Sequence, residues 1–134
     1  MIKFHCQKSF NGFNLDVKFE IASGEFVALY GKSGSGKSTI LRLLAGFDKP
    51  NSGVISNGEQ IYYNKNIFLP PQKRNIGYLF QDYALFPNMT VMQNLLFANN
   101  DLKFATELLE FIELLEFKNA LPSTLSGGQK QRIA

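Results

Sequence analysis

The residues whose types and spacing most clearly indicate chemistry lie between positions 31 and 38. They read Gly-Lys-Ser-Gly-Ser-Gly-Lys-Ser, which fits the phosphate-loop pattern G-x-x-x-x-G-K-[S/T] in full. Glycines let a backbone turn tightly and bring its amides close to a phosphate, and the amino end of a following helix adds partial positive charge. We expect Lys37 to reach the terminal phosphates of a nucleotide and the Ser38 hydroxyl to ligate Mg²⁺. The alternative is a glycine-rich turn that matches by coincidence.

A second glycine-containing motif lies near the end of the sequence. Residues 125–129 read Leu-Ser-Gly-Gly-Gln and are followed by Lys-Gln-Arg. Ser126 has the residue type of a helix N-cap, and the two glycines after it would leave the backbone amides of the first turn uncovered. An ordinary serine cap on a glycine-rich turn is the alternative for this segment taken alone.

Together the two motifs resemble those of the ABC ATPase family, whose signature sequence is LSGGQ. The resemblance covers essentially all 134 residues. It implies an α/β fold, namely the P-loop NTPase core of an ABC nucleotide-binding domain with an N-terminal antiparallel β subdomain and a helical subdomain, truncated after the signature motif. It also implies one partial ATP-binding domain over 1–134. Its β subdomain and phosphate-loop core would span about 1–82, and its helical subdomain about 83–134.

The resemblance assigns roles to individual residues. Residues 76–81 are similar to the family's strand that ends in a glutamine, so Lys37 and Gln81 would be catalytic residues, and Ser38 and Gln81 would ligate Mg²⁺ beside ATP. The family's signature segment faces the γ-phosphate held by the other subunit, which implies a head-to-tail homodimer. The residues expected to contact ATP are Gly31, Lys32, Ser33, Gly34, Ser35, Gly36, Lys37, Ser38, Thr39, Ser126, Gly127, Gly128 and Gln129.

Two further segments resemble those of ABC importers. In that group the residues after the glutamine form part of a groove that receives a helix of the membrane permease. The residues expected to line it here are Leu85, Phe86, Pro87 and Met89. Residues 69–77 look like importer ATPases for molybdate, sulfate, sugars, polyamines and iron, and the compact N-terminus looks most like the molybdate subunit. The implied partners are a transmembrane permease and, through it, a solute-binding protein, at the cytoplasmic face of the inner membrane.

Two departures from the family pattern affect the expected activity. Where the family stacks adenine on an aromatic ring, this sequence has Lys8, with Phe10 and Phe13 nearby as possible substitutes. The family's strand ending in Asp-Glu and its switch histidine would follow Ala134. We therefore expect the chain alone to hydrolyse ATP poorly or not at all, and to be poorly soluble because a sheet edge stays uncovered.

Two other functional classes stay open at this point. A nucleotide-binding regulatory or pseudo-ATPase fragment would share every motif upstream of Ala134. A soluble ABC protein of DNA repair or translation would usually carry two cassettes or a long coiled-coil insertion. Neither feature is found here, and the connection from Gln81 to the signature is short.

The elements that must position these motifs follow from hydrophobic patterning. Alternation of apolar and polar residues predicts strands over 2–6 and 15–21, joined by a turn at Asn11–Gly12, and short strands at 54–55 and 61–63. A continuous apolar run at 26–30 predicts a strand buried on both faces, directly before the phosphate loop.

The remaining segments predict one more strand and several helices. Residues 76–80 are expected to form the strand. The helix after Gly36 is expected to bury an apolar side made of Ile40, Leu41, Leu43, Leu44 and Phe47. From Thr90 the spacing becomes helical. The longer stripe expected to pack in the core consists of Leu102, Ala105, Leu108, Leu109, Ile112 and Leu115.

Composition favours one globular domain that does not bind nucleic acid. Apolar residues make up 45% and charged residues 19% of the chain, and the net charge is only +3. The Lys73–Arg74 pair is expected to lie on a solvated face. The single cysteine, Cys6, excludes an internal disulfide, and together with His5 it is too small a set for zinc. Without a signal peptide or an apolar run near about 18 residues, we expect a soluble intracellular protein that contacts the membrane only through the permease.

Overall fold

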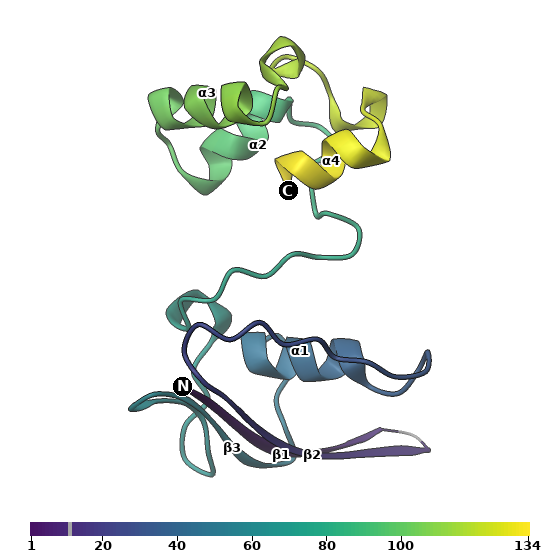
Figure 1. Cartoon of the computed structure of the whole chain (residues 1–134), viewed down its shortest axis with the longest axis vertical. Coiled ribbons are helices and arrows are strands. Elements are labelled where there is room, and N and C mark those ends of the chain that lie inside the picture. The colour runs from purple at the N-terminus through teal and green to yellow at the C-terminus, as the bar shows by residue number, and fades with distance from the viewer. Residues whose placement is uncertain (11) are drawn as a thin grey trace. The chain divides into compact units, whose positions relative to one another are not determined.

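The computed structural model describes residues 1–10 and 12–134, which divide into two compact units. The first unit, Met1–Gly77, is a β-sheet with one helix packed on it, and the second, Tyr78–Ala134, is helical (Figure 1). Asn11, half of the turn predicted between the first two strands, lies outside the described residues, whereas Gly12 lies in a turn with a φ of 84°.

A four-stranded antiparallel sheet forms the first unit. Its strands are β1 (Ile2–Phe10), β2 (Phe13–Ile21), β3 (Ser52–Asn57) and β4 (Gln60–Tyr63), in the order β2-β1-β3-β4. β1 and β2 pair from Ile2 with Ile21 to Phe10 with Phe13. The four strands predicted from alternation and short apolar runs are confirmed. They extend beyond the predicted ranges because backbone pairing continues through polar residues such as Gln7 and Asn14.

Helix α1 (Lys37–Ala45) lies on one face of this sheet (Figure 1). The buried cluster between helix and sheet consists of Phe4, Cys6, Leu15, Ile40, Leu43, Ile55, Tyr62 and Tyr63. The helix predicted after Gly36 is therefore confirmed, but its apolar side is narrower than predicted. Leu41 and Phe47 are exposed. Leu41 points off the face that carries Ile40 and Leu43, and Phe47 lies beyond the end of the helix.

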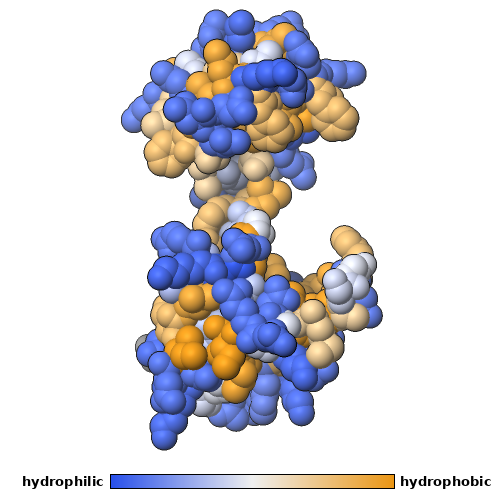
Figure 2. Space-filling model, turned by 90° about the vertical axis from the view of Figure 1, so that its left-hand side faces the viewer, coloured by the Kyte–Doolittle hydropathy of each residue, from blue (hydrophilic) through white to orange (hydrophobic). Residues whose placement is uncertain are grey.

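The apolar run at 26–30 is not a buried strand, contrary to the prediction. Residues 25–32 have no regular secondary structure, and Phe26 is 99% exposed. The strand predicted at 76–80 is also wrong, since these residues lie outside any strand and Leu79 is 59% exposed. A strand inside a sheet needs hydrogen-bonded neighbours, and among the described residues the sheet consists of β1 to β4 alone. Exposed apolar side chains of both units are visible in Figure 2.

The Lys73–Arg74 pair was predicted to lie on a solvated face, but only Lys73 does so. Lys73 is exposed, but Arg74 is 0% exposed. Its Nη1 donates to the carbonyl oxygens of Leu43 (2.8 Å) and Leu44 (2.7 Å), and its Nε donates to that of Leu69 (2.7 Å). The side chain is buried because backbone carbonyls at the end of α1 offer hydrogen bonds that a sequence pattern of charges does not reveal.

The second unit contains three helices and two short 3₁₀ turns. The helices are α2 (Val91–Ala98), α3 (Leu102–Phe111) and α4 (Gly127–Ile133), and the turns are Leu115–Phe117 and Pro122–Thr124. Its buried cluster consists of Val91, Leu109, Leu114, Leu125 and Ile133. Of the stripe predicted to pack in the core, Ala105 and Leu109 are buried as expected. Leu102, at the first position of α3, is 61% exposed.

The reactivity of the single thiol, Cys6, tests whether the buried cluster of the first unit is closed to solvent. Cys6 is fully buried, and that burial raises the pKa of its thiol to about 12, against the opposing influence of nearby hydrogen bonds and Arg74. Because the thiolate is the reactive form, we expect iodoacetamide at pH 8 to label the native chain far more slowly than the urea-unfolded chain. Mass spectrometry would measure both rates. Equal labelling rates would contradict a closed core around β1.

Candidate functional site

The phosphate loop ends in the residue that caps α1. Gly36 occupies the N-cap with a φ of 91°, a left-handed conformation that glycine adopts easily. A Cβ at this position would lie 3.0 Å from Cδ1 of Leu15 and 3.3 Å from Cε1 of Phe13. Backbone conformation and packing against the sheet therefore both favour glycine here.

The Lys37 ammonium folds back over the loop. Its Nζ donates to the carbonyl oxygens of Gly31 and Lys32, each at 2.8 Å. The loop is closed by the N–H of Ser35, which donates to the Lys32 carbonyl at 3.2 Å. The first N–H groups of a helix have no carbonyl partner within it. A cation and a set of such amides at one loop form an arrangement suited to a polyanion such as a triphosphate.

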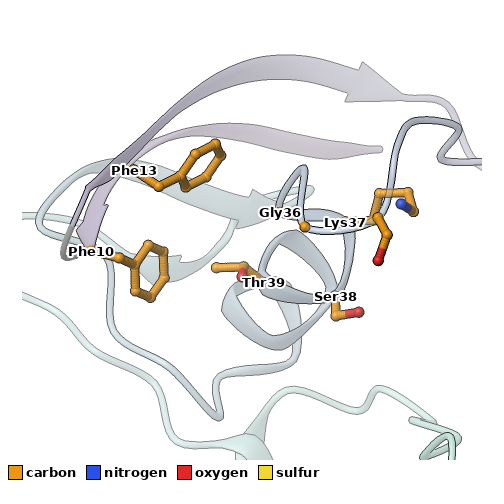
Figure 3. Close-up of a pocket in the computed structure, with 8 residues that line it drawn as sticks. Phe10, Phe13, Gly36, Lys37, Ser38 and Thr39 are labelled. Atoms are coloured by element: carbon orange, nitrogen blue, oxygen red, sulfur yellow. The ribbon is translucent and has the colours of Figure 1, made fainter.

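A cavity of about 360 Å³ adjoins this loop. It is lined by Phe10, Phe13, Ser33, Gly34, Gly36, Lys37, Ser38 and Thr39. Figure 3 shows the two phenyl rings projecting from the adjoining ends of β1 and β2 toward the first turn of α1. Their centroids are 6.5 Å apart. The cavity has the size of ordinary small-molecule sites and joins an aromatic wall to an anion-binding loop.

Lys8, at the position expected for a stacking aromatic residue, does not line this cavity. Its Nζ donates to the carbonyl oxygen of Lys49 at 2.7 Å and lies 5.7 Å from the centroid of the Phe10 ring. The residues that the structure places beside the loop are therefore the two neighbouring phenylalanines.

The signature segment begins α4 with a reciprocal cap. The N–H of Gln129 donates to Oγ of Ser126 (3.3 Å), and the N–H of Ser126 donates to Oε1 of Gln129 (2.8 Å). A Cβ added at Gly127 or Gly128 would meet no atom within 4 Å. The N-cap predicted for Ser126 is confirmed. The backbone at the two glycines is not covered by neighbouring side chains.

Gln81 lies in the second unit, at the start of a turn that leads to α2, and is exposed. Tyr83 and Ala84 in this turn have φ values of 63° and 50°, a left-handed conformation uncommon for residues with a Cβ. The structure thus brings together the predicted site residues from Gly31 to Thr39 in the first unit, while Gln81 and the signature segment belong to the second.

A second cavity of about 230 Å³ lies in the helical unit. Its lining residues are Tyr83, Ala84, Leu85, Phe86, Asn94, Leu95, Phe97, Ala98, Ile133 and Ala134. Two of the four residues predicted for a permease groove, Leu85 and Phe86, are among them, and Pro87 and Met89 are not. The rings of Phe86 and Phe97 meet edge to face with centroids 4.6 Å apart, and both rings are partly exposed.

Asn94 lines this cavity and holds the backbone beside it through hydrogen bonds. The sequence-based prediction did not identify this residue. Its side chain is 9% exposed and accepts from the N–H of Phe86 (2.8 Å). It also donates to the carbonyl oxygens of Phe86, Met89 and Thr90, at 3.0 to 3.2 Å. A signal did exist, because Asn94 lies three residues after Val91 and therefore on the apolar face of α2. A polar residue on such a face requires hydrogen-bond partners.

No cluster of three or more His, Cys, Asp or Glu side chains that could hold a metal occurs in the described residues. None of the helices in residues 1–10 and 12–134 combines the length and apolar character that crossing a membrane requires. The Ser38 hydroxyl in the first turn of α1 is one oxygen that could hold a Mg²⁺ carried in with nucleotide phosphates, since Mg²⁺ commonly uses few protein ligands beside phosphate and water.

The antiparallel sheet, the glycine loop before α1 and the capped LSGGQ helix together define the fold of an ATP-binding cassette. The family model described as "ABC transporter" matches residues 15–134, and the chain belongs to that family.

Several relatives are import ATP-binding proteins. The chain is 45% identical to the sulfate/thiosulfate import ATP-binding protein CysA of Thermosynechococcus vestitus, over 97% of this chain and 40% of that protein. It is 38% identical to the molybdenum import ATP-binding protein ModC of Photobacterium profundum, over 90% of this chain and 35% of that protein. The chain thus spans 35% to 40% of the length of these two relatives.

A solved structure agrees with this assignment. The chain matches the dimeric structure of MJ0796, a bacterial ABC transporter cassette, with a TM-score of 0.78 and 32% identity, over 99% of this chain and 66% of that one. A second structure of that cassette is described as a post-hydrolysis state bound to ADP and Pi.

The buried amide of Asn94 yields a prediction for the helical unit. Asn94→Ala would leave the N–H of Phe86 and several carbonyls without their partner, so we expect the free energy of unfolding to fall by about 1–3 kcal/mol. Urea denaturation followed by circular dichroism would measure the change. The matched control is Asn100→Ala, at an exposed position beyond α2. Equal stability of Asn94→Ala and the control would contradict the role of the amide.

Proposed function

We propose that this chain binds Mg²⁺-ATP at the phosphate loop and is part of the ATP-binding subunit of an ABC importer. The observation that supports this most strongly is the single cavity that joins the loop of Lys37 to the rings of Phe10 and Phe13. A nucleotide has a polyanionic end and an aromatic end, and this cavity offers a matching surface to each.

The phosphate end would be held by backbone and cation. Lys37 would exchange its bonds to the Gly31 and Lys32 carbonyls for bonds to the β- and γ-phosphates. The Ser38 hydroxyl would ligate Mg²⁺, which neutralises charge on the phosphates when bound. Gln81 would join this site as a Mg²⁺ ligand and orient the attacking water.

The base end would rest against the two phenylalanines. Among the described residues, those that line the cavity include no carboxylate or amide side chain beside these rings to read the edge of a base. Stacking on an aromatic face contributes affinity without distinguishing bases strongly. We therefore propose that Phe10 and Phe13 take the place of the family's stacking residue.

The signature segment would act on a second nucleotide. With its glycines uncovered, residues 126–129 can present α4 amides to the γ-phosphate bound by another subunit. The MJ0796 relative was solved as a dimer, which supports dimerisation of this chain. The head-to-tail arrangement rests on the resemblance of residues 125–129 to the family signature. Two copies would then enclose two ATP molecules.

The helical unit would receive the permease. The cavity bordered by Leu85, Phe86 and Phe97 is largely apolar and shaped by the Asn94 amide. An apolar groove of this kind suits the apolar face of a partner helix. Through such a permease the subunit would work with a solute-binding protein at the cytoplasmic face of the inner membrane.

For the solute, molybdate or a related oxyanion is our working proposal. Relatives that import sulfate/thiosulfate and molybdenum support an oxyanion. A spermidine/putrescine import protein of Nitrosospira multiformis is 44% identical to the chain, and an sn-glycerol-3-phosphate import protein of Brucella abortus is 42% identical. The residues of this domain therefore do not themselves select the solute.

Binding of ATP provides the direct test. We expect Lys37→Ala to weaken Mg²⁺-ATP binding roughly 10- to 100-fold, because it removes charge-assisted hydrogen bonds to the phosphates. Isothermal titration calorimetry on the 134-residue chain would measure this. Lys18→Ala, an exposed lysine on β2, is the control of equal charge change. Absence of binding by the unmodified chain, or equal loss in both variants, would refute the proposal.

The base contact is tested by comparing two ligands. We expect Phe10→Leu and Phe13→Leu each to weaken ATP binding about three- to tenfold through loss of stacking. Binding of inorganic tripolyphosphate, which has no base, should stay within about twofold of the unmodified chain. Phe104→Leu, on the exposed side of α3, is the control for ATP binding. Equal losses for ATP and tripolyphosphate would show that the rings support the loop rather than the base.

A further inference from the structure

We infer that Arg74 is a positioning residue for the phosphate loop, because its buried guanidinium fixes the carboxyl end of α1, the helix whose amino end carries Lys37 and Ser38. This inference rests on the proposed function, since it concerns the geometry of the same loop. Arg74 would touch neither nucleotide nor metal. It would act through the helix.

The guanidinium first closes the open end of the helix. The last carbonyls of an α-helix lack intrahelical partners and carry partial negative charge. Nη1 of Arg74 donates to two of them, on Leu43 (2.8 Å) and Leu44 (2.7 Å). A positive group with hydrogen-bond donors is the complement that this end of α1 requires.

The same group then ties the helix to the rest of the first unit. Nε donates to the carbonyl oxygen of Leu69 (2.7 Å), and Nη2 donates more weakly to that of Tyr62 in β4 (3.4 Å). In return, the Tyr62 hydroxyl donates to the carbonyl oxygen of Arg74 (2.6 Å). The rings of Tyr62 and Phe68 lie 5.2 and 5.4 Å from the guanidinium carbon. The Arg74 side chain therefore links α1, β4 and the backbone at Leu69.

An arginine suits this place better than any other residue. The guanidinium is a planar fork of five donors, so it can serve carbonyls on several sides at once, whereas lysine offers donors from one point. Burial lowers the pKa of Arg74, with Tyr62 and Cys6 acting in the opposite direction. The group stays protonated at physiological pH, because an arginine is not deprotonated in proteins.

Gly46 shows independently that the fold makes room for this group. Gly46 ends α1 in a left-handed conformation with a φ of 89°. A Cβ at this position would lie 2.5 Å from Nε and 2.6 Å from Cζ of Arg74. The helix therefore ends in the residue that lets the guanidinium approach its last carbonyls.

The geometry of a short helix connects this anchor to the loop. α1 has nine residues and is therefore about 13 Å long. A rotation of about 5° about its carboxyl end would move its amino end by roughly 1 Å. Displacements of this size matter where several groups must meet one ligand. Ile40, Leu43 and the partly buried Leu44 pack one side of the helix against the core of the sheet. In this inference the guanidinium anchor at the carboxyl end restricts the tilt that this packing leaves.

The test compares the ATP affinities of variants at a temperature at which all of them are folded. Arg74→Lys keeps the charge but not the fork, and Gly46→Ala displaces the guanidinium without replacing it. Ile55→Ala is the matched control, since it removes a buried side chain from the same core without touching the α1 carbonyls. Thermal unfolding would first establish a temperature at which all variants are folded, and calorimetry there would give the Kd for Mg²⁺-ATP. We expect Arg74→Lys and Gly46→Ala each to weaken binding about tenfold, and Ile55→Ala to stay within about twofold.

Two results would overturn the inference. Arg74→Lys and Gly46→Ala could bind ATP as tightly as the unmodified chain while losing stability, which would make Arg74 a packing residue only. Alternatively, Ile55→Ala could weaken binding as much as they do, which would make the effect one of general destabilisation. Failure of the proposed function looks different, because the unmodified chain would then not bind ATP, or Lys37→Ala would weaken binding no more than Lys18→Ala does. Failure of the inference alone leaves the dependence on Lys37 intact.

Discussion

The first unit is organised around a buried positive charge that donates hydrogen bonds to four backbone carbonyls. Arg74 is fully buried, and its donors reach Leu43, Leu44, Leu69 and Tyr62. An ionised group in an apolar core is strongly unfavourable unless its hydrogen bonds are satisfied, so every carbonyl it uses must stay in place. That requirement fixes the end of α1 against the sheet. The phosphate loop lies at the other end of the same helix, so its position depends on the contacts that Arg74 makes.

The second unit also contains a buried polar side chain whose hydrogen bonds must be satisfied, but this side chain is neutral. The Asn94 amide holds the turn after Gln81 by bonding to the backbone at Phe86, Met89 and Thr90. Reciprocal caps at Thr90 and Ser126 each engage two N–H groups at the amino ends of α2 and α4. In both units a buried polar side chain holds backbone segments in place through its hydrogen bonds.

Local chemistry made much of this fold predictable. The phosphate loop, the Ser126 cap and the strands with alternating residues all follow from neighbours in sequence, and the structure confirms the strands and the cap. The apolar run at 26–30 did not behave as predicted because a strand also depends on a partner, which composition does not specify. Burial of Arg74 depends on carbonyls 30 and 31 residues away, and a pair of adjacent cations gives no indication of them. Phe10 and Phe13 were foreseen as candidates, but their place beside the loop required the register of β1 with β2.

Hydrogen exchange of the arginine side chains tests the central claim most directly. The chain has three arginines, Arg42, Arg74 and Arg132, so their Nε–H signals can be assigned in nitrogen-15 NMR spectra by single substitutions. If the Arg74 guanidinium is buried on the α1 carbonyls, its Nε–H will exchange with water much more slowly than that of the exposed Arg132, and still more slowly when ATP is bound. Exchange of Arg74 at the rate of Arg132, with or without ATP, would contradict the account.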